Sequence, residues 1–66
     1  MIVEVNGEKR EIAPGMSVAR LLHELGLRPG RVVVELNRSP VSRDDHEATL
    51  LREGDVIEIV HFVGGG

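Results

Sequence analysis

The sequence contains no cysteine, tryptophan or tyrosine, and Phe62 is its one aromatic residue. Because cysteine is absent, no disulfide can hold the fold, and no four-ligand zinc pattern is present. A chain of 66 residues is near the size at which stability is marginal, so its hydrophobic core must hold the fold alone. Little of the chain is left to build an active-site cleft.

Long apolar runs and basic stripes are also missing. No run approaches the roughly 20 apolar residues of a membrane span. The first residues lack the basic and then hydrophobic pattern of an export signal, so we expect a cytoplasmic protein without a membrane partner. The net charge of −3 and the scarcity of aromatic residues argue against nucleic acid as a ligand. An acidic surface suits a protein partner.

The first part of the sequence predicts a β-hairpin. Three apolar side chains alternate on one face of the first strand, namely Met1, Val3 and Val5. Asn6-Gly7 is typical of a two-residue hairpin turn. The second strand, residues 8–13, is polar as an edge strand is, and Pro14-Gly15 ends it.

Residues 18–25 predict one amphipathic helix. Ser17 is a favourable N-cap, and Gly26 is typical of the position just after a helix. Between them apolar side chains recur at helical spacing: Val18, Leu21, Leu22 and Leu25. Leu27 is placed to close over the last turn, and Arg28-Pro29-Gly30 prevents the helix from continuing.

Two further strands are expected from residues 31–36 and 55–63. The first has one face made of Val32, Val34 and Leu36 and another made of Val33 and Glu35. The second is apolar on both faces, with Ile57 and Ile59 on one side and Val56, Val60 and Phe62 on the other. A strand that is apolar on both faces belongs in the middle of a sheet.

The polar stretch 37–47 predicts irregular structure. Ser42 either caps a single helical turn or begins a plain loop. A short strand at 48–51 and a turn at 53–55 are expected next. Arg38 with Asp44 and Asp45 is interpreted as a solvated loop rather than an acid–base site. Three histidines, His23, His46 and His61, lack metal-ligand spacing and are expected to be surface or hydrogen-bonded residues.

The order of elements is hairpin, helix and then three strands. One short helix across a mixed sheet of four or five strands is the arrangement of the α+β β-grasp, or ubiquitin-like, fold. We therefore expect one domain over residues 1–63 and a flexible glycine tail over 64–66. The helix covers one face of the sheet. The uncovered apolar side chains are Val33, Val56, Val60 and Phe62, with Val63 following them, and we interpret them as a partner-binding patch.

The sequence ends in Gly64, Gly65 and Gly66, directly after the last strand. Glycines at this position are either a frayed end or the functional part of the molecule. Side-chain-free residues add little to a packed fold, because glycine loses the most backbone entropy on ordering. Three extended residues reach about 10 Å beyond the folded body, which suits insertion into a narrow channel.

The whole chain resembles the ThiS family of sulfur carriers in thiamine thiazole synthesis. The resemblance rests on MIVEVNGEKREI, SVARLLHELGL, VVVELN and, above all, DVIEIVHFVGGG. It implies that a ThiF-like adenylating enzyme uses ATP to adenylate the carboxyl group of Gly66, which is then converted to a thiocarboxylate. It also implies a sulfur-donating desulfurase or rhodanese, and a ThiG-like thiazole synthase that receives the sulfur.

The chemistry of the residues agrees with the role of a carrier that is not itself an enzyme. A carboxylate is a poor electrophile, so it must gain a leaving group before sulfur can be attached. The chain has no phosphate-binding glycine loop between a strand and a helix, so we expect it to bind neither ATP nor another cofactor. Without a thiol, any sulfur it carries must sit on the terminal carboxyl group.

Other functions are compatible with the same fold. A carrier for molybdopterin synthesis or transfer-RNA thiolation is one alternative, although molybdopterin carriers tend to have a proline just before the end, which His61-Phe62-Val63 lacks. A protein-conjugation tag or a binding module is another. Detection of a thiocarboxylate rather than a covalent protein adduct distinguishes these classes.

Overall fold

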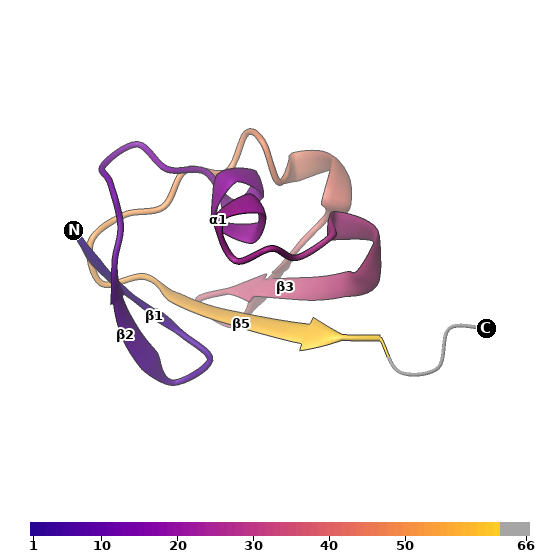
Figure 1. Ribbon diagram of the computed structural model, residues 1–66, viewed down its shortest axis with the longest axis horizontal. Coiled ribbons are helices and arrows are strands. Elements are labelled where there is room, and N and C mark those ends of the chain that lie inside the picture. The colour runs from indigo at the N-terminus through magenta and orange to yellow at the C-terminus, as the bar shows by residue number, and fades with distance from the viewer. Residues whose placement is uncertain (63–66) are drawn as a thin grey trace.

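The computed structural model describes residues 1–62 and shows a five-stranded mixed sheet with one helix packed across one face (Figure 1). The strands are ordered β2-β1-β5-β3-β4. Their bounds are Ile2–Val5 (β1), Glu8–Glu11 (β2), Val32–Leu36 (β3), Ser39–Val41 (β4) and Val56–His61 (β5). The single α-helix, α1, spans Val18–Glu24. The predicted α+β class and β-grasp arrangement are confirmed.

The first hairpin forms as the sequence predicts. Asn6 and Gly7 both have positive φ, 49° and 85°, which is the backbone of the type I′ turn whose twist matches that of paired strands. β2 is exposed along its length and forms one edge of the sheet. Its polar side chains suit that position because they discourage pairing with another chain.

Helix α1 begins at its predicted cap. The Ser17 hydroxyl accepts a hydrogen bond from the backbone N–H of Arg20 at 3.0 Å. The N–H groups of Val18 and Ala19 donate to the carbonyls of Thr49 and His46 at 2.9 and 3.0 Å. The loop after β4 therefore satisfies helix donors that lack partners within the helix.

The other end of α1 is a Schellman motif. Gly26 has φ +73°, its N–H donates to the carbonyl of His23, and the N–H of Leu27 donates to the carbonyl of Leu22. A positive φ is costly for any residue with a Cβ, which accounts for glycine at this position. The chain then passes through a 3₁₀ turn, η1 (Pro29–Arg31), directly into β3.

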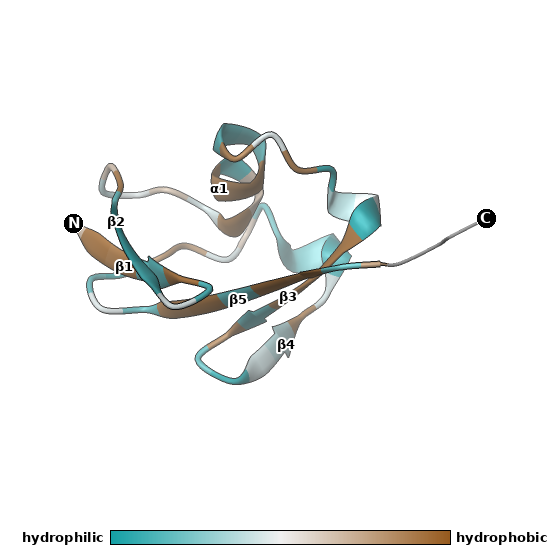
Figure 2. Cartoon of the chain, turned by 60° about the horizontal axis from the view of Figure 1, so that its bottom comes forward, coloured by the Kyte–Doolittle hydropathy of each residue, from teal (hydrophilic) through white to brown (hydrophobic). Residues whose placement is uncertain are grey.

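β5 is the central strand. It runs parallel to β1 and antiparallel to β3, with five successive partner pairs from Val32↔His61 to Leu36↔Ile57. The first and last strands are thus adjacent, as the element order predicts. The fully buried side chains come from α1 and the three inner strands, and are Leu21, Leu22, Val18, Ile57, Val3 and Val34. In Figure 2 the three inner strands are largely brown, whereas β2 is teal.

Two predictions between β3 and β5 are wrong. Residues 48–51 form no strand but a single bridge, Ser17↔Leu50, because their backbone groups bond to the chain at the start of α1. The second wrong prediction is irregular structure throughout residues 37–47. This stretch contains strand β4, which follows a turn with positive φ at Asn37 and Arg38, 51° and 72°. The helical turn that the sequence left open is present as η2 (Arg43–Asp45), with the Ser42 hydroxyl accepting from Asp44 N–H.

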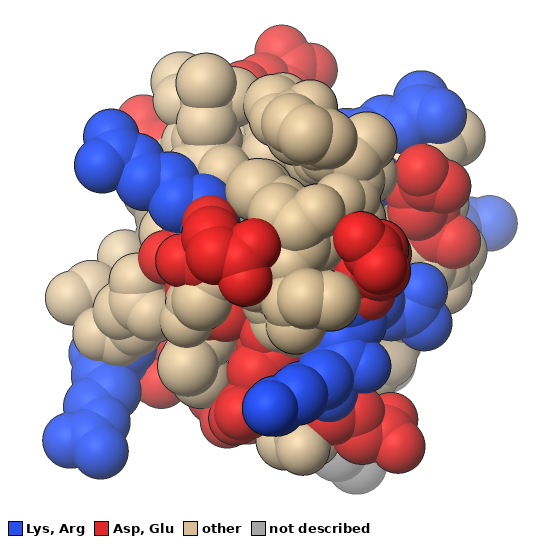
Figure 3. Space-filling model, turned by 90° about the vertical axis from the view of Figure 1, so that its left-hand side faces the viewer, with Lys and Arg blue, Asp and Glu red and all other residues tan. Residues whose placement is uncertain are grey.

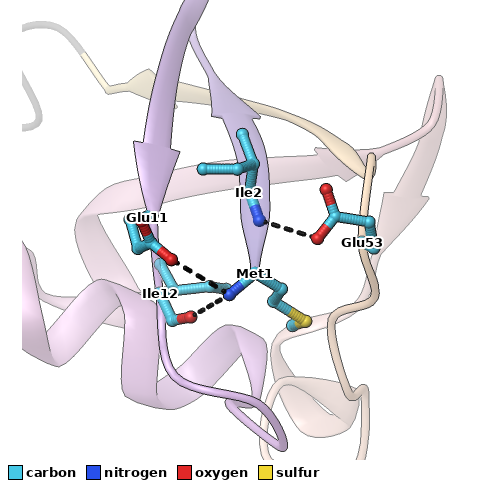
Figure 4. A network of polar contacts seen from close by, with 5 residues as sticks. All are labelled: Met1, Ile2, Glu11, Ile12 and Glu53. Carbon is cyan, nitrogen blue, oxygen red and sulfur yellow. Dashed lines mark hydrogen bonds and ion pairs between the residues drawn. The ribbon is translucent and has the colours of Figure 1, made fainter.

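The start of β1 is held from two sides (Figure 4). The Met1 amino group donates to the carbonyl of Ile12 at 2.8 Å and lies 3.5 Å from a carboxylate oxygen of Glu11. On the opposite side, the N–H of Ile2 donates to the Glu53 carboxylate at 2.9 Å. These contacts join the edge hairpin to the loop that enters β5.

Candidate functional site

The end of β5 is firmly held on both sides. On one side His61 pairs with Val32, and the N–H of Phe62 donates to the carbonyl of Arg31 at 3.0 Å. On the other side, the Asn6 side chain accepts from the N–H of Ile59 at 2.7 Å and donates to its carbonyl at 3.0 Å. The amide of Asn6 therefore extends the pairing beyond the last residue of β1. The final described residues leave the sheet from a fixed position.

The predicted partner-binding side chains within residues 1–62 lie on the uncovered side of the sheet or at its end. Val33 and Val60 are directly opposite each other and are 42% and 62% exposed. Phe62, just past the strand, is 59% exposed. Val56 is exposed as well, and so is Ile2 on the neighbouring strand, which the sequence reasoning did not select although it alternates with buried Val3. The exposure expected of Val33, Val56, Val60 and Phe62 is confirmed, and their contact with a partner stays a prediction.

Carboxylates divide this face into two apolar zones. Glu35 and Glu58 are directly opposite each other in the ladder, between Val33–Val60 on one side and Val56 on the other. Like charges in such a pair repel, and among residues 1–62 neither carboxylate forms an ion pair. The apolar zone nearer the end of β5 consists of Val33, Val60 and Phe62, and we call it the strand-end patch.

Four of the predicted site residues, Val63, Gly64, Gly65 and Gly66, lie outside the described residues. The reactive carboxyl group expected at Gly66 is among them, as are the tail residues. The structure does place Phe62, the residue directly before this segment, and the strand end that leads to it.

The histidines lie apart from one another in the fold. His23 is exposed on α1, and His61 is exposed at the end of β5. His46, in contrast, is 4% exposed, and its Nδ1 has no hydrogen-bond partner. The expectation that it would be a surface or hydrogen-bonded residue is therefore wrong. Within residues 1–62, no three His, Asp or Glu side chains converge as metal ligands do.

The remaining polar loop has no enclosed geometry. Arg38 lies in the turn before β4, and Asp44 and Asp45 lie in η2; all three are exposed. This agrees with their interpretation as a solvated loop. None of the helices in the described part of the chain is long and apolar enough to span a bilayer.

A mixed sheet of this order, covered by one helix and with its central strand leading into the glycines, defines the ubiquitin-like class of proteins. The chain belongs to the ThiS family, whose model matches residues 3–66. It is similar to the crystal structure of the thiamine biosynthesis protein ThiS from Geobacter metallireducens, with a TM-score of 0.86 and 35% identity over the whole of both chains.

Curated relatives carry related names. The sulfur carrier protein ThiS of Bacillus subtilis is 40% identical over 50 residues, which are 76% of each chain. A thiazole synthase of Magnetococcus marinus is 44% identical over 66 residues, which are all of this chain and 20% of that protein. The chain thus spans about a fifth of the length of the thiazole synthase it matches.

Proposed function

We propose that the chain is a sulfur carrier for synthesis of the thiamine thiazole and that the α-carboxyl group of Gly66 is its reactive group. The observation that carries the proposal is the firmly held end of β5 at His61, five residues before Gly66. A fixed strand end followed by residues without bulk can deliver a carboxyl group to a buried site at a defined distance. Membership of the ThiS family and the name of the Bacillus relative support the same role.

The proposed reaction has two steps. In the first, a ThiF-like enzyme promotes attack of the Gly66 carboxylate on the α-phosphate of ATP, which forms an acyl-adenylate and releases pyrophosphate. In the second, the terminal sulfur of a persulfide on a desulfurase or rhodanese attacks the carbonyl carbon, AMP leaves with the C–O bond electrons, and a thiol reductant cleaves the S–S bond of the resulting acyl disulfide. The product is a thiocarboxylate, in which sulfur replaces one oxygen. Adenylation is required because a free carboxylate is a poor electrophile.

In this scheme the chain is a substrate of its partners and not a catalyst. ATP is bound by the activating enzyme, and we assign no cofactor to the chain itself. The strand-end patch is the surface we assign to docking, because exposed aromatic residues such as Phe62 are enriched at protein interfaces and the two valines beside it extend the apolar area. Because the patch includes Phe62, a partner docked on it would be next to the residue after which the tail segment begins.

A ThiG-like thiazole synthase is the acceptor that we propose for the sulfur. The Magnetococcus thiazole synthase contains a segment similar to this chain over all 66 residues, within a polypeptide about five times as long. A carrier and an acceptor in one polypeptide stay at high effective concentration, which is useful only if the two interact. We expect the 66-residue chain to interact with the same kind of acceptor.

Adenylation is tested by exchange of labelled pyrophosphate into ATP. The chain is mixed with its activating enzyme, ATP and labelled pyrophosphate, in the absence of a sulfur donor. Because formation of the acyl-adenylate is reversible, label should enter ATP only when the chain is present. A chain whose Gly66 carboxyl is converted to the amide is the control and should give no exchange. Equal exchange with the amidated chain would exclude Gly66 as the adenylated group.

A further inference from the structure

A groove runs along the helix-facing side of the end of β5, on the opposite side of the strand from Val60. Two adjoining hollows form it and share Leu27 and His61. The first lies between the β1–β2 hairpin and the end of α1, and apolar side chains line it: Val5, Leu25, Leu27 and Ile59. The second lies at the strand end, beside η1, and Phe62 is among its lining residues.

The charges along this groove are predominantly basic. Arg10 and Glu8 line the first hollow; Lys9 borders it too, but it pairs with Glu4, so its side chain points to the other face of the sheet. Arg28 and Arg31 line the second hollow, which no acidic residue lines. All four basic side chains are exposed, and among residues 1–62 none of them forms an ion pair. For a chain with a net charge of −3, this is a local excess of positive charge.

Local backbone structure brings two of these cations together. Arg28 is the N-cap of η1 and Arg31 is its last residue, so the two are three positions apart. The N–H of Arg31 donates to the carbonyl of Arg28 at 2.9 Å, which closes the turn, and both residues line the second hollow. The guanidinium of Arg43 also lies against η1, close enough that a Cβ at Gly30 would be 3.2 Å from one of its nitrogens. Repulsion among neighbouring cations is relieved when an anionic group binds to them.

The opposite end of the molecule is different. Figure 3 views the end at which β5 begins, and there acidic and basic side chains alternate over the surface. Arg28 and Arg31 lie at the other end, beside the strand end from which the tail continues. A partner that binds these two arginines is therefore contacted close to the place where it receives the tail.

We propose that this groove receives an acidic segment of the activating enzyme, with carboxylates beside Arg28 and Arg31 and an apolar side chain over Leu27. The inference rests on the proposed function, because it assigns the occupant to that enzyme. The enzyme then contacts β5 from both sides: apolar contacts on the open face and charged contacts on the helix side. Exposed charge pairs of this kind mainly raise the association rate and orient the partners, which suits a carrier that must also be released.

The test compares two double charge reversals, each of which changes the net charge equally. Arg28→Glu with Arg31→Glu alters the groove. Arg38→Glu with Arg52→Glu is the control, because the turn before β4 and the turn before β5 lie at the other end of β5. Affinity for the purified activating enzyme is measured by titration calorimetry at about 0.05 M and 0.5 M ionic strength, across which charge screening changes strongly. Thermal melts check that all variants are folded.

We expect the groove variant to bind at least ~10-fold more weakly than the control at low salt and to lose most of its salt dependence. Equal affinities of the groove and control variants would overturn the inference. The inference would also be overturned if the groove variant lost affinity for the thiazole synthase but not for the activating enzyme. Conversion of the unaltered chain to a thiocarboxylate is measured in parallel. If that conversion occurs while the two variants bind equally, the groove assignment fails and the proposed carrier function stands.

Discussion

At the scale of single residues, Phe62 is unusual because the one aromatic side chain of the molecule is 59% exposed. Burial of a large apolar side chain in a core contributes to stability, so its exposure leaves that contribution available for binding. Because Phe62 lies just before the tail segment in the sequence, a partner that receives the tail is expected to come close to the Phe62 side chain.

We therefore predict that Phe62→Ala weakens binding to the activating enzyme by more than about 1 kcal/mol and leaves the melting temperature nearly unchanged. Leu50→Ala is the matched control, since Leu50 is equally exposed but lies beside the start of α1. Calorimetric titration of both variants measures the difference. Equal affinity of Phe62→Ala and Leu50→Ala would remove Phe62 from the interface.

His46 is the second residue of interest, because one of its buried ring nitrogens has no hydrogen-bond partner. Its side chain is buried, and Nδ1 has no partner, while its carbonyl accepts from the N–H of Ala19. A buried polar atom without a hydrogen bond costs about 1–3 kcal/mol, whereas an apolar replacement of similar shape avoids this cost. The backbone contact to α1 does not depend on the side chain.

We predict that His46→Leu leaves the free energy of unfolding unchanged or raises it by up to about 2 kcal/mol. Urea unfolding monitored by circular dichroism gives the value. His46→Ala is the comparison: it removes the same nitrogen but leaves a cavity, and it should be less stable than His46→Leu. A loss of more than about 1 kcal/mol in His46→Leu would show that the imidazole is satisfied in solution.

At the scale of elements, α1 could be predicted because several local signals agree. The cap at Ser17, the apolar spacing and the glycine at position 26 all specify the same helix, and each is found in its expected role. The place of β5 in the middle of the sheet was predictable for a similar reason, since both of its faces are apolar.

β4 could not be predicted in the same way. Its turn uses Arg38 at φ +72°, where glycine is usual, and the strand has only three residues, one of them Pro40. The turn is held instead by tertiary contacts, because the Asn37 side chain bonds to Asp55 and to the N–H of Val56. Residues 48–51 have the apolar pattern of a strand, but their backbone groups bond to the chain at the start of α1, a tertiary contact that the local sequence does not specify.

Part of the candidate site could be predicted from local sequence, and part depends on tertiary contacts. Exposure of Val33 and Val60 follows from the sequence, because one helix covers only one side of a sheet. The basic groove does not follow, since Arg28 and Arg31 lie some 30 residues before His61 in the sequence. The sequence shows them only as neighbours of the Pro29-Gly30 breaker. Their proximity to the strand end depends on the β3–β5 pairing.

For the helix we predict that Leu22→Ala lowers the free energy of unfolding by about 2–5 kcal/mol. Leu22 is fully buried between α1 and the sheet, so its truncation leaves a cavity in a small core. Leu50→Ala again provides the exposed control and should cost less than about 1 kcal/mol. Urea unfolding at one temperature compares them, and equal costs would contradict the packing described for α1.

At the scale of the whole molecule, the fold holds the last strand at its centre. β5 has a neighbour on each side, its end is fixed by Asn6 and Arg31, and its two faces carry different surfaces. One face has Val33 and Val60 of the strand-end patch and the other has the basic groove, while Phe62 at the strand end borders both. We propose that this fold is a scaffold that presents the carboxyl group of Gly66 to partner enzymes.

The measurement that tests this claim most directly is the mass of the chain after reaction. The chain is incubated with its activating enzyme, ATP and a sulfur source, and is then examined by intact-mass and fragmentation spectrometry. The account predicts a mass increase equal to replacement of one oxygen by sulfur, located by fragmentation at Gly66.

Chains with one residue added after Gly66, or without Gly65 and Gly66, should show no such increase, although their thermal melts should be nearly unchanged. Gly65→Val should react poorly, because a β-branched side chain widens the tail and restricts its backbone. Sulfur located at any other residue, or conversion of the extended chain to a thiocarboxylate, would contradict the assignment of Gly66 as the reactive group.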